Sequence, residues 1–263
     1  MNKIVSKEAL SANVMKFVVE APLIAKSGKP GHFIILKTGK FGERIPLTIA
    51  DSNIQDGTIT LIIQQVGKST RKICALDAGG YIDDMVGPLG KATHIERFGT
   101  VVCACGGVGT APMYPIARAM KQAGNKVIVV LAARNRALIL MEQEMRNFAD
   151  EVIIMTDDGS YGQKGLVTQG IEQVINREKV NLCVTIGPAV MMKFVSLLTK
   201  RYEIPTVASL NTIMVDGTGM CGACRVTVGG KTRFVCVDGP EFDAHLVDFD
   251  EMMMRLGAYR DYE

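Results

Sequence analysis

The pattern of apolar and polar positions divides the chain into parts with different periods. In residues 1–96, short runs alternate between apolar and polar side chains, and turn signals rich in Gly, Pro and Asp separate them. Alternation with a period of two is typical of strands with one buried face. We expect strands over residues 14–19, 32–37 and 58–63. Several short strands at this spacing predict an antiparallel barrel or sandwich.

Between residues 97 and 209 the pattern changes to apolar runs that alternate with amphipathic stretches. The apolar runs predict strands at residues 100–105, 126–132, 151–155, 182–186 and 206–209. The amphipathic stretches predict helices at residues 112–123, 138–148, 166–178 and 190–200. Strands that alternate with helices in this way predict a Rossmann-like α/β domain, in which helices cover both faces of a parallel sheet.

Residues 210–263 form a third part, which is rich in Gly and Cys up to about residue 245. We expect a compact module there. The last eighteen residues are rich in Met and Asp, and we expect a tail that docks on a neighbour. The predicted domains are therefore residues 1–96, 97–209 and 210–263.

Composition and charge exclude several classes of protein. The chain has 263 residues, of which 48% are hydrophobic and 22% charged, and this balance is typical of a globular protein. Its formal net charge is +3 and no run of Lys or Arg exceeds two residues, so we expect neither a nucleic acid nor a membrane surface as partner. No secretory signal opens the chain, and no apolar stretch reaches about 18 residues. These features predict a cytoplasmic protein.

Three cysteines and one aspartate form the most informative motif, Asp216, Cys221, Cys224 and Cys236. Their spacing is D-x4-C-x2-C-x11-C. A plant-type two-iron cluster uses C-x4-C-x2-C and a more distant cysteine, so the spacing is kept while Asp216 replaces the first ligand. Three thiolates and one carboxylate suit a [2Fe-2S] centre, although the same residue types can also hold zinc. Glycines lie between the ligands at Gly217, Gly219 and Gly222.

The remaining four cysteines lie far upstream of this motif. In a reducing compartment, scattered cysteines behave as small buried hydrophobes. We therefore expect core positions for Cys74, Cys103, Cys105 and Cys183.

Three loops of the predicted α/β domain carry features of a dinucleotide site. Residues 106–112, Gly-Gly-Val-Gly-Thr-Ala-Pro, follow the first strand and open a helix. Such a turn lets the backbone approach a pyrophosphate at the helix N-terminus, although the spacing differs from G-x-G-x-x-G. Residues 157–160 and 187–191 also follow strands. Because the carboxyl ends of parallel strands share one edge of a sheet, the loops predict a dinucleotide crevice.

The residues leave the choice between NAD and NADP open. An acidic residue that binds the ribose is expected after the second strand, but Arg134 and Arg136 stand there. Arginines at this point often accept a 2′-phosphate, which would favour NADP. The alternative is that they are solvated or pair with Glu142 or Glu144.

In the first part of the chain, residues 44–48 and 66–70 are candidates for flavin contacts. Each follows or forms part of a strand-like run and offers hydroxyl and backbone groups. By spacing alone, both segments are compatible with ordinary turns.

Taken together, these motifs resemble the electron-transfer subunit of type B dihydroorotate dehydrogenase. They are similar as well to the small subunits of NADH-dependent ferredoxin:NADP oxidoreductase and of sulfide dehydrogenase, within the ferredoxin–NADP reductase superfamily. The resemblance covers residues 1 to about 250, and its most specific segments are residues 216–224 and 236–240.

The resemblance implies a flavin-binding barrel, a nucleotide domain and a [2Fe-2S] module. In the barrel it implies that the Thr48 hydroxyl reaches flavin N5, which gives Thr48 a catalytic role. The implied FAD contacts are Arg44, Pro46, Leu47, Thr48, Ile62, Ile63, Gln64, Gly67, Ser69 and Thr70. The implied nicotinamide-nucleotide contacts are Gly107, Gly109, Thr110, Gly187, Pro188 and Met191, to which the loop pattern adds Asp158. The implied cluster ligands are Asp216, Cys221, Cys224 and Cys236.

The chain departs from the superfamily pattern at three positions. Ile45 stands where the superfamily has Arg, with Arg44 beside it, and Ile186 stands where many relatives have Cys. Asp216 replaces the Cys of the dihydroorotate branch, which favours the ferredoxin:NADP oxidoreductase and sulfide dehydrogenase branch.

The function implied is electron transfer between NAD(H), FAD and a [2Fe-2S] cluster, and onward to a larger iron–sulfur flavoprotein subunit. NADP(H) stays open as the nucleotide. The alternatives are the electron-transfer subunit of dihydroorotate dehydrogenase, a stand-alone NAD(P)H flavin reductase, and a zinc-knuckle binding module joined to a nucleotide-sensing domain.

Overall fold

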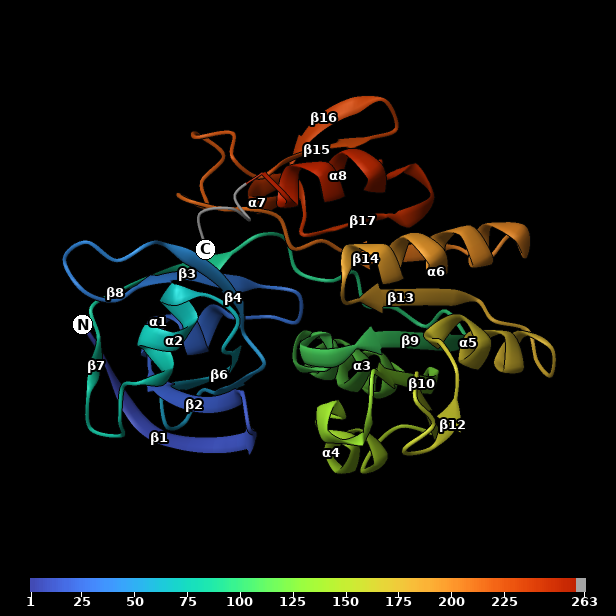
Figure 1. Cartoon of the computed structure of the whole chain (residues 1–263), viewed down its shortest axis with the longest axis horizontal. Helices are drawn as coiled ribbons and strands as arrows, with labels where there is room; N and C mark the ends of the chain where they lie inside the picture. The colour runs from blue at the N-terminus through green and yellow to red at the C-terminus, as the bar shows by residue number, and fades with distance from the viewer. Residues whose placement is uncertain (259–263) are drawn as a thin grey trace.

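The protein consists of an N-terminal barrel, a parallel sheet beside it and a C-terminal module that lies over both (Figure 1). The computed structural model describes residues 1–258. No helix in this range combines the length and the low polarity needed to cross a bilayer. The cytoplasmic location expected from the sequence stays a prediction.

The barrel is built from two antiparallel sheets around one core. The five-stranded sheet has the order β5-β6-β2-β1-β7, and the three-stranded sheet has the order β4-β3-β8. Ile59, Leu61 and Ile63 point from β6 into this core, whereas Ile62 faces away from it. The predicted period of two is confirmed. The strands are β1 (Asn2–Ser11), β2 (Val14–Glu20), β3 (Phe33–Lys37), β4 (Ile45–Thr48), β5 (Asp51–Asn53), β6 (Thr58–Gln64), β7 (Tyr81–Ile82) and β8 (Asp84–Leu89), and the helices are α1 (Pro22–Ser27) and α2 (Lys68–Cys74).

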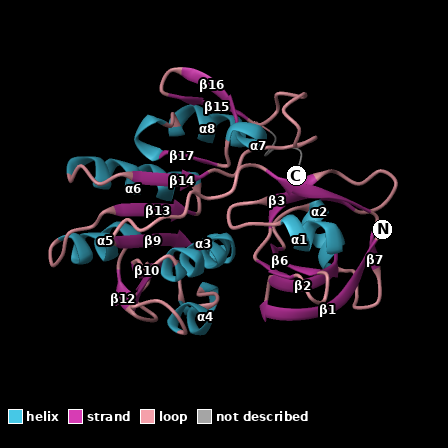
Figure 2. Ribbon diagram, turned by 180° about the vertical axis from the view of Figure 1, so that it is seen from behind, coloured by secondary structure: helices cyan, strands magenta, loops and turns pink. Residues whose placement is uncertain are grey.

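The second sheet has seven strands in the order β12-β11-β10-β9-β13-β14-β17, and its first six strands are parallel. Helices cover both of its faces (Figure 2). Cys103 and Cys105 of β9 pack toward α3, while Val102 and Ala104 pack toward α5 and α6. The strands are β9 (Thr100–Gly106), β10 (Lys126–Ala133), β11 (Glu151–Thr156), β12 (Gln163–Lys164), β13 (Leu182–Ile186) and β14 (Thr206–Ser209), and the helices are α3 (Thr110–Gln122), α4 (Glu142–Arg146), α5 (Val167–Ile175) and α6 (Ala189–Arg201).

One helix expected from the sequence is broken. Residues 138–148 were expected to form a single helix, but a 3-10 turn at Arg136–Leu138 is followed by the short helix α4. Met141 adopts the left-handed region with φ of 55° directly before α4. Because an α-helix needs negative φ at every residue, Met141 interrupts the segment.

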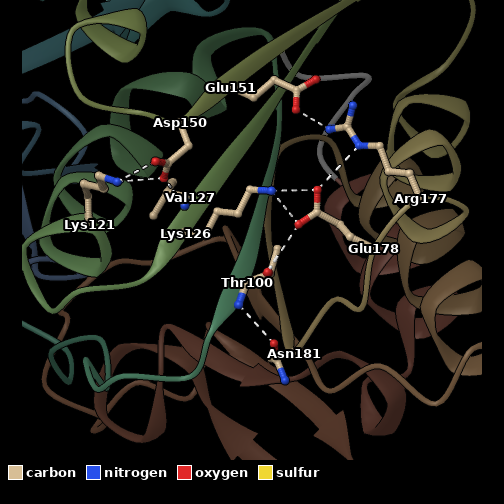
Figure 3. A network of polar contacts seen from close by, with 9 residues as sticks. All are labelled: Thr100, Lys121, Lys126, Val127, Asp150, Glu151, Arg177, Glu178 and Asn181. Atoms are coloured by element: carbon tan, nitrogen blue, oxygen red, sulfur yellow. Dashed lines mark hydrogen bonds and ion pairs between the residues drawn. The ribbon is translucent and has the colours of Figure 1, made fainter.

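A polar network fixes the strands at the amino edge of this sheet (Figure 3). Lys126, the first residue of β10, pairs with Glu178 at 2.7 Å, and the backbone N–H of Thr100 donates to Asn181 at 3.0 Å. The Asp150 carboxylate accepts from Lys121 at 2.7 Å and from the backbone N–H of Val127 at 2.8 Å. Structural polar contacts thus occupy this edge, and the three predicted nucleotide loops lie at the opposite one.

The third part of the chain adds a strand to the nucleotide sheet. β17 (Glu241–Asp243) pairs antiparallel with β14, so the sheet continues across the predicted boundary at residue 210. The rest of the module contains β15 (Arg225–Val228), β16 (Lys231–Phe234), α7 (Val235–Asp238), a 3-10 turn at Ala244–Leu246 and α8 (Phe249–Leu256).

The expected docking tail is wrong for the residues of α8. Phe249 and Met252 of this helix are buried in the module's own core, together with Met192 of α6. An amphipathic helix buries its apolar face where a core is available. Residues 259–263 of the predicted tail lie outside the described residues.

The four upstream cysteines are core residues, as predicted. Each is buried and none is in a disulfide. Burial raises the pKa of the Cys105 and Cys183 thiols to about 12, which keeps them protonated and unreactive near neutral pH.

Candidate functional site

Asp216 is held in one orientation by the backbone of the loop that follows it. One carboxylate oxygen accepts the N–H of Thr218 at 2.7 Å, and the other accepts the N–H of Cys221 at 2.8 Å. These two hydrogen bonds, that from Thr218 first, lower the pKa of Asp216. The loop therefore presents an ionised carboxylate next to the first cysteine of the motif.

Cys224 and Cys236 form a second pair within the module. Their sulfur atoms lie 3.2 Å apart, and both residues are buried. Cys224 ends the loop before β15, and Cys236 belongs to α7. Burial raises the pKa of the Cys236 thiol to about 12, and the neighbouring Cys224 thiol acts in the same direction. Two thiols this close are suited to share one metal atom as thiolates.

The four predicted ligands thus lie as two pairs. The Asp216 carboxylate accepts the backbone N–H of Cys221 on one loop, and the Cys224 sulfur at the end of that loop lies beside the Cys236 sulfur of α7. Among residues 1–258, no three His, Cys, Asp or Glu side chains converge on a single metal ion. Two pairs match one pair of ligands for each iron of a two-iron cluster, whereas a zinc knuckle needs four ligands around one ion.

The glycines of this loop follow from its shape. Gly217 has φ of 78° and Gly219 has φ of 85°, a region that favours glycine. A Cβ added to Gly217 would lie 2.7 Å from the Cδ1 atoms of both Ile35 and Leu89. The loop of residues 216–224, called the cluster loop below, therefore packs directly against strands β3 and β8 of the barrel.

Two of the predicted nucleotide loops touch each other at the carboxyl edge of the sheet. A Cβ on Gly109 would lie 2.5 Å from the carbonyl oxygen of Ile186 and 3.0 Å from the Cα of Gly187. The Thr110 hydroxyl donates to the carbonyl of Gly107 at 2.9 Å and closes the turn. The Met191 side chain packs against Gly187 and Gly106, where a Cβ on either would come within 2.6 Å of it. Pro188 directly precedes α6.

The third loop lies beside the arginines expected after the second strand. Asp158 accepts the N–H of Ser160 at 2.9 Å, and hydrogen bonds from Ser160 lower the pKa of Asp158. The Ser160 hydroxyl accepts the N–H of Arg136 at 2.9 Å, and the Arg136 guanidinium lies 5.1 Å from the centre of the Tyr161 ring. The N–H of Asp158 donates to the carbonyl of Arg134 at 3.2 Å.

Glu142, one of the two carboxylates suggested as partners of Arg134 and Arg136, has other partners in the structure. Glu142 pairs with Arg146 at 2.8 Å and accepts from the Tyr161 hydroxyl at 3.1 Å. Its carboxylate is therefore engaged by residues other than Arg134 and Arg136.

The predicted flavin contacts lie on or directly before β4, on β6, and at the start of α2, where Gly67 precedes the helix and Ser69 and Thr70 belong to its first turn. Thr48 ends β4, which contacts β6, and Pro46 and Leu47 of that strand are half-buried. The Thr70 hydroxyl accepts the N–H groups of Val66 and Gly67 at 3.1 Å and 3.0 Å. The space around Gly67 is open, since an added Cβ would meet nothing within 4 Å. The other predicted contacts on β6 are Ile62, Ile63 and Gln64.

Several of these residues are engaged in ways the sequence did not indicate. Ile63 is fully buried in the barrel core, so only its backbone can face a ligand. The Ser69 hydroxyl donates to the Glu43 carboxylate. Arg44 donates through Nε to the carbonyl of Val215 at 3.0 Å and lies 3.7 Å from Asp84.

The barrel and the nucleotide domain meet beside these loops. Ile62 shares a buried apolar cluster with Ala111 of α3 and Leu140, and Val108 of the first nucleotide loop packs against it. Arg118 of α3 pairs with Asp51 of β5 at 2.6 Å. The predicted flavin strand β6 is thereby adjacent to the predicted nucleotide loop.

Sequence reasoning missed a buried carboxyl group where the three parts of the chain meet. Glu241 of β17 accepts a hydrogen bond from the Thr93 hydroxyl at 2.5 Å, and burial raises the pKa of Glu241 to about 7. Thr93 lies between the barrel and β9, 148 residues from Glu241 in sequence. No local pattern announces a contact over such a separation.

Comparison with known proteins gives the family. Residues 211–248 match the iron–sulfur cluster binding domain of dihydroorotate dehydrogenase B, and residues 104–197 match the oxidoreductase NAD-binding domain. A Thermotoga maritima protein named dihydroorotate dehydrogenase B (NAD(+)), electron transfer subunit homolog is 44% identical over 263 residues, which cover 100% of this chain and 93% of that protein. The chain belongs to the family of dihydroorotate dehydrogenase B electron transfer subunits and their homologues.

Two further proteins are similar to this chain over nearly its whole length. An uncharacterized protein from the adh 3′ region of Clostridium beijerinckii is 48% identical over 272 residues, 100% of this chain and 92% of that protein. A solved chain of NADH-dependent reduced ferredoxin-NADP oxidoreductase has a TM-score of 0.95 and 43% identity, covering 99% of this chain and 94% of that one. The chain is an electron-transfer protein of the oxidoreductase class, and the predicted fold class is confirmed.

Proposed function

We propose that the chain is the electron-transfer subunit of a heteromeric oxidoreductase of the ferredoxin:NADP oxidoreductase type. It exchanges electrons between NAD(H) and a larger partner subunit by means of FAD and a [2Fe-2S] cluster. The observation that carries this proposal is the arrangement of the four predicted ligands. The Asp216 carboxylate accepts the backbone N–H of Cys221, and the sulfur atoms of Cys224 and Cys236 lie 3.2 Å apart. Bound FAD would supply the conversion between hydride and single-electron transfer, and the cluster would carry single electrons.

Asp216, Cys221, Cys224 and Cys236 hold the cluster in this proposal. The donor set fits, since it offers four anionic ligands in two pairs, three of them on the loop of residues 216–224 and the fourth on α7. Two backbone N–H groups, those of Thr218 and Cys221, fix the orientation of the Asp216 carboxylate. Carboxylate donates less charge to iron than thiolate does, so Asp216 would hold the cluster at a higher potential than a cysteine would.

The barrel holds FAD in this proposal through β4, β6 and the start of α2. Thr48 offers a hydroxyl at the end of β4, Gln64 offers an amide at the end of β6, and the open space at Gly67 admits a ligand close to the backbone. Arg44 and Ser69 are weaker members of the predicted set, because each already has a protein partner.

The nucleotide site is formed in this proposal by the loops of Gly107–Thr110, Asp158 and Gly187–Met191. The contact between the first and the last of these loops at the carboxyl edge of the parallel sheet matches the usual crevice for a dinucleotide. We propose NAD(H) as the nucleotide, because the matching relative from Thermotoga maritima is named for NAD(+). Val108 packs against the buried apolar cluster that contains Ile62. This contact brings the nucleotide loop next to the flavin strand β6 and shortens the path for hydride.

The larger partner subunit is proposed to cover the exposed tip of the cluster loop. Met220, directly before the exposed Cys221, is 89% exposed, and Val215, directly before Asp216, is 47% exposed. Large apolar side chains around a redox centre are suited to a protein interface, which would also shield the cluster from water.

The proposal is tested on anaerobically purified protein. We expect FAD and two irons per chain, a flavin spectrum with a broad sulfide-to-iron shoulder, and a rhombic paramagnetic signal after dithionite reduction. A colourless protein that binds zinc and no iron would contradict the proposal. Co-purification with a larger iron–sulfur flavoprotein separates the heteromeric enzyme from a stand-alone flavin reductase.

The Asp216→Cys variant tests the proposed carboxylate ligand. We expect it to keep the cluster and to lower its midpoint potential, because a thiolate donates more charge to iron. The matched control is Asp238→Asn, which changes a nearby carboxylate that accepts the N–H of Phe234 and lies outside the proposed ligand set. Equal potentials in the wild type and the Cys variant would remove Asp216 from the ligand set.

A second candidate is the electron-transfer subunit of a dihydroorotate dehydrogenase, since the Thermotoga maritima relative is named as a homologue of that subunit. Dihydroorotate-dependent NAD reduction in the purified complex would support it over the first proposal.

A further inference from the structure

Three guanidinium groups contact backbone carbonyl oxygens of the cluster loop. Arg44 donates to Val215 at 3.0 Å, Arg225 to Gly222 at 3.2 Å and Arg255 to Ala223 at 3.1 Å. They come from different parts of the chain. Arg44 directly precedes β4 of the barrel and is 171 residues from Val215, Arg225 begins β15 at the end of the loop itself, and Arg255 belongs to α8.

Each of these contacts fixes the direction of a whole peptide unit. In a trans peptide the carbonyl oxygen and the next residue's N–H point in opposite directions within one plane. A carbonyl drawn toward an arginine therefore turns the following N–H away from that arginine. The three N–H groups oriented in this way belong to Asp216, Ala223 and Cys224, of which two are proposed ligands.

The contacts also bring positive charge to a loop that carries anionic ligands. A reduced cluster is one unit more negative than an oxidised one, so nearby cations and inward N–H groups stabilise the reduced form and raise its potential. Arg44 and Arg255 are half-buried, which lowers the screening of their charges by water, whereas Arg225 is exposed. Asp84 lies 3.7 Å from Arg44 and reduces its net contribution.

We propose that Arg44 and Arg255 are positioning residues of the cluster site. Arg44 holds the cluster loop from the barrel and Arg255 holds it from α8, and together they set the potential of the cluster. The proposal rests on the function proposed above. It also gives Arg44 a role different from the flavin contact that the family resemblance implied. Because Arg44 directly precedes β4, which carries the predicted flavin contacts Pro46 and Thr48, its hydrogen bond to Val215 links that strand to the loop that carries Asp216.

The test uses full-length protein with its cofactors and its partner, in the variants Arg44→Gln and Arg255→Gln. We expect the midpoint potential of the cluster to fall in both, the paramagnetic line shape to change, and iron to pass to EDTA about tenfold faster, as loss of one charge-assisted hydrogen bond allows. Arg44→Lys keeps the charge but loses the planar fork, so it should recover the potential in part and the line shape less.

The matched control is Arg233→Gln, which removes the same charge from the exposed face of β16 in the same module. We expect its potential and line shape to equal those of the wild type. If Arg44→Gln and Arg255→Gln bind iron and behave like Arg233→Gln, the positioning role is overturned while the proposed function stands. If the wild type binds no iron, the proposed function itself fails.

Discussion

The two glycine-rich loops of this protein show two ways of building a cofactor site. The loop from Gly106 to Thr110 follows a strand that is buried from Val101 onward, enters a thirteen-residue helix and packs against the neighbouring loop at Gly187. The loop from Asp216 to Cys224 lies between short elements. It is held by hydrogen bonds to its own Asp216 and by arginines from the barrel and α8.

The nucleotide loop is supported by elements of its own domain, whereas the loop of residues 216–224 also depends on a residue of the barrel. The nucleotide loop takes its shape from the regular secondary structure on either side of it, since it joins α3 to β9, the strand in the middle of the sheet. The cluster loop has few regular backbone hydrogen bonds, so its shape depends on contacts from outside and on the metal it is proposed to hold. The nucleotide site should therefore tolerate loss of the cluster, while the cluster site should be sensitive to changes elsewhere.

The largest effect is expected from removing a cluster thiol. Cys224→Ala takes away one of two sulfurs that lie 3.2 Å apart, and we expect loss of nearly all bound iron together with the paramagnetic signal. NADH binding and flavin reduction should persist, because the nucleotide loop is supported separately. Iron analysis, paramagnetic resonance and stopped-flow flavin reduction measure these quantities.

The control for that change is Cys183→Ala, which removes a buried thiol in the core beneath α5 and α6. It should keep its iron. Loss of both iron and NADH binding in Cys224→Ala alone would show that the two sites share their support, which would contradict the comparison.

The next effect concerns the nucleotide loop. Gly109→Ala brings a Cβ to 2.5 Å from the carbonyl oxygen of Ile186, a backbone atom that cannot turn aside. We expect NADH affinity to fall about a hundredfold, since overpacking of this kind costs roughly 1–3 kcal/mol, and the iron content to stay unchanged. Titration of NADH by flavin or nucleotide fluorescence measures the affinity.

Gly107→Ala is the matched control for Gly109→Ala. Gly107 has φ of 55°, but an added Cβ would meet nothing within 4 Å. It tests backbone strain alone, which costs about 1–2 kcal/mol, so its effect should be the smaller of the two. The reverse order would show that the contact with Ile186 does not shape the site.

The sequence predicted the parts of this fold that depend on local pattern. Period-two alternation predicted three barrel strands, β2, β3 and β6, and apolar runs predicted the central strands of the parallel sheet, within one or two residues at their ends. The other five barrel strands were not predicted. The sequence spacing also predicted one set of four ligands, which the fold arranges as two pairs: Asp216, Cys221, Cys224 and Cys236. Local signals were sufficient because these elements are set by residues near one another in sequence.

What the sequence could not predict depends on long-range contacts. Arg44 contacts Val215, Glu241 contacts Thr93, and β17 joins β14 across the expected domain boundary. Any exposed arginine or glutamate would have the same local pattern. The break at Met141 was missed for a different reason, because a non-glycine residue with positive φ has no compositional signal.

A smaller effect is expected at the junction of the three parts, where support crosses module boundaries. Burial raises the pKa of Glu241 from 4.5 to about 7. Between pH 4.5 and pH 7, the Glu241 carboxyl group is therefore protonated in the folded state and ionised in the unfolded state. Stability from this group is therefore fully present below pH 4.5 and falls as the pH rises to about 7. Glu241→Gln keeps a hydrogen-bonding side chain and removes the titration.

We expect Glu241→Gln to gain about 2 kcal/mol over the wild type at pH 8 and little at pH 4.5, with the difference developing between these values. Thermal unfolding as a function of pH measures it. Glu203→Gln is the control. An equal difference at every pH would mean that Glu241 does not titrate in this range.

The smallest effect is expected from the ion pair that joins the barrel to the nucleotide domain. Arg118 contacts Asp51 at 2.6 Å and lies 4.9 Å from the centre of the Tyr114 ring, but both charged side chains are more than a third exposed. Exposed pairs of this kind contribute up to about 1 kcal/mol. Arg118→Met should lower stability by no more than this, and the loss should shrink in high salt, because the buried cluster around Ile62 joins the same two parts without charge. A double-mutant cycle with Asp51→Asn isolates the pair. A coupling well above this value would mean that polar contacts, rather than apolar burial, hold the nucleotide loop against the flavin strand, and the two glycine-rich loops would then share one kind of support.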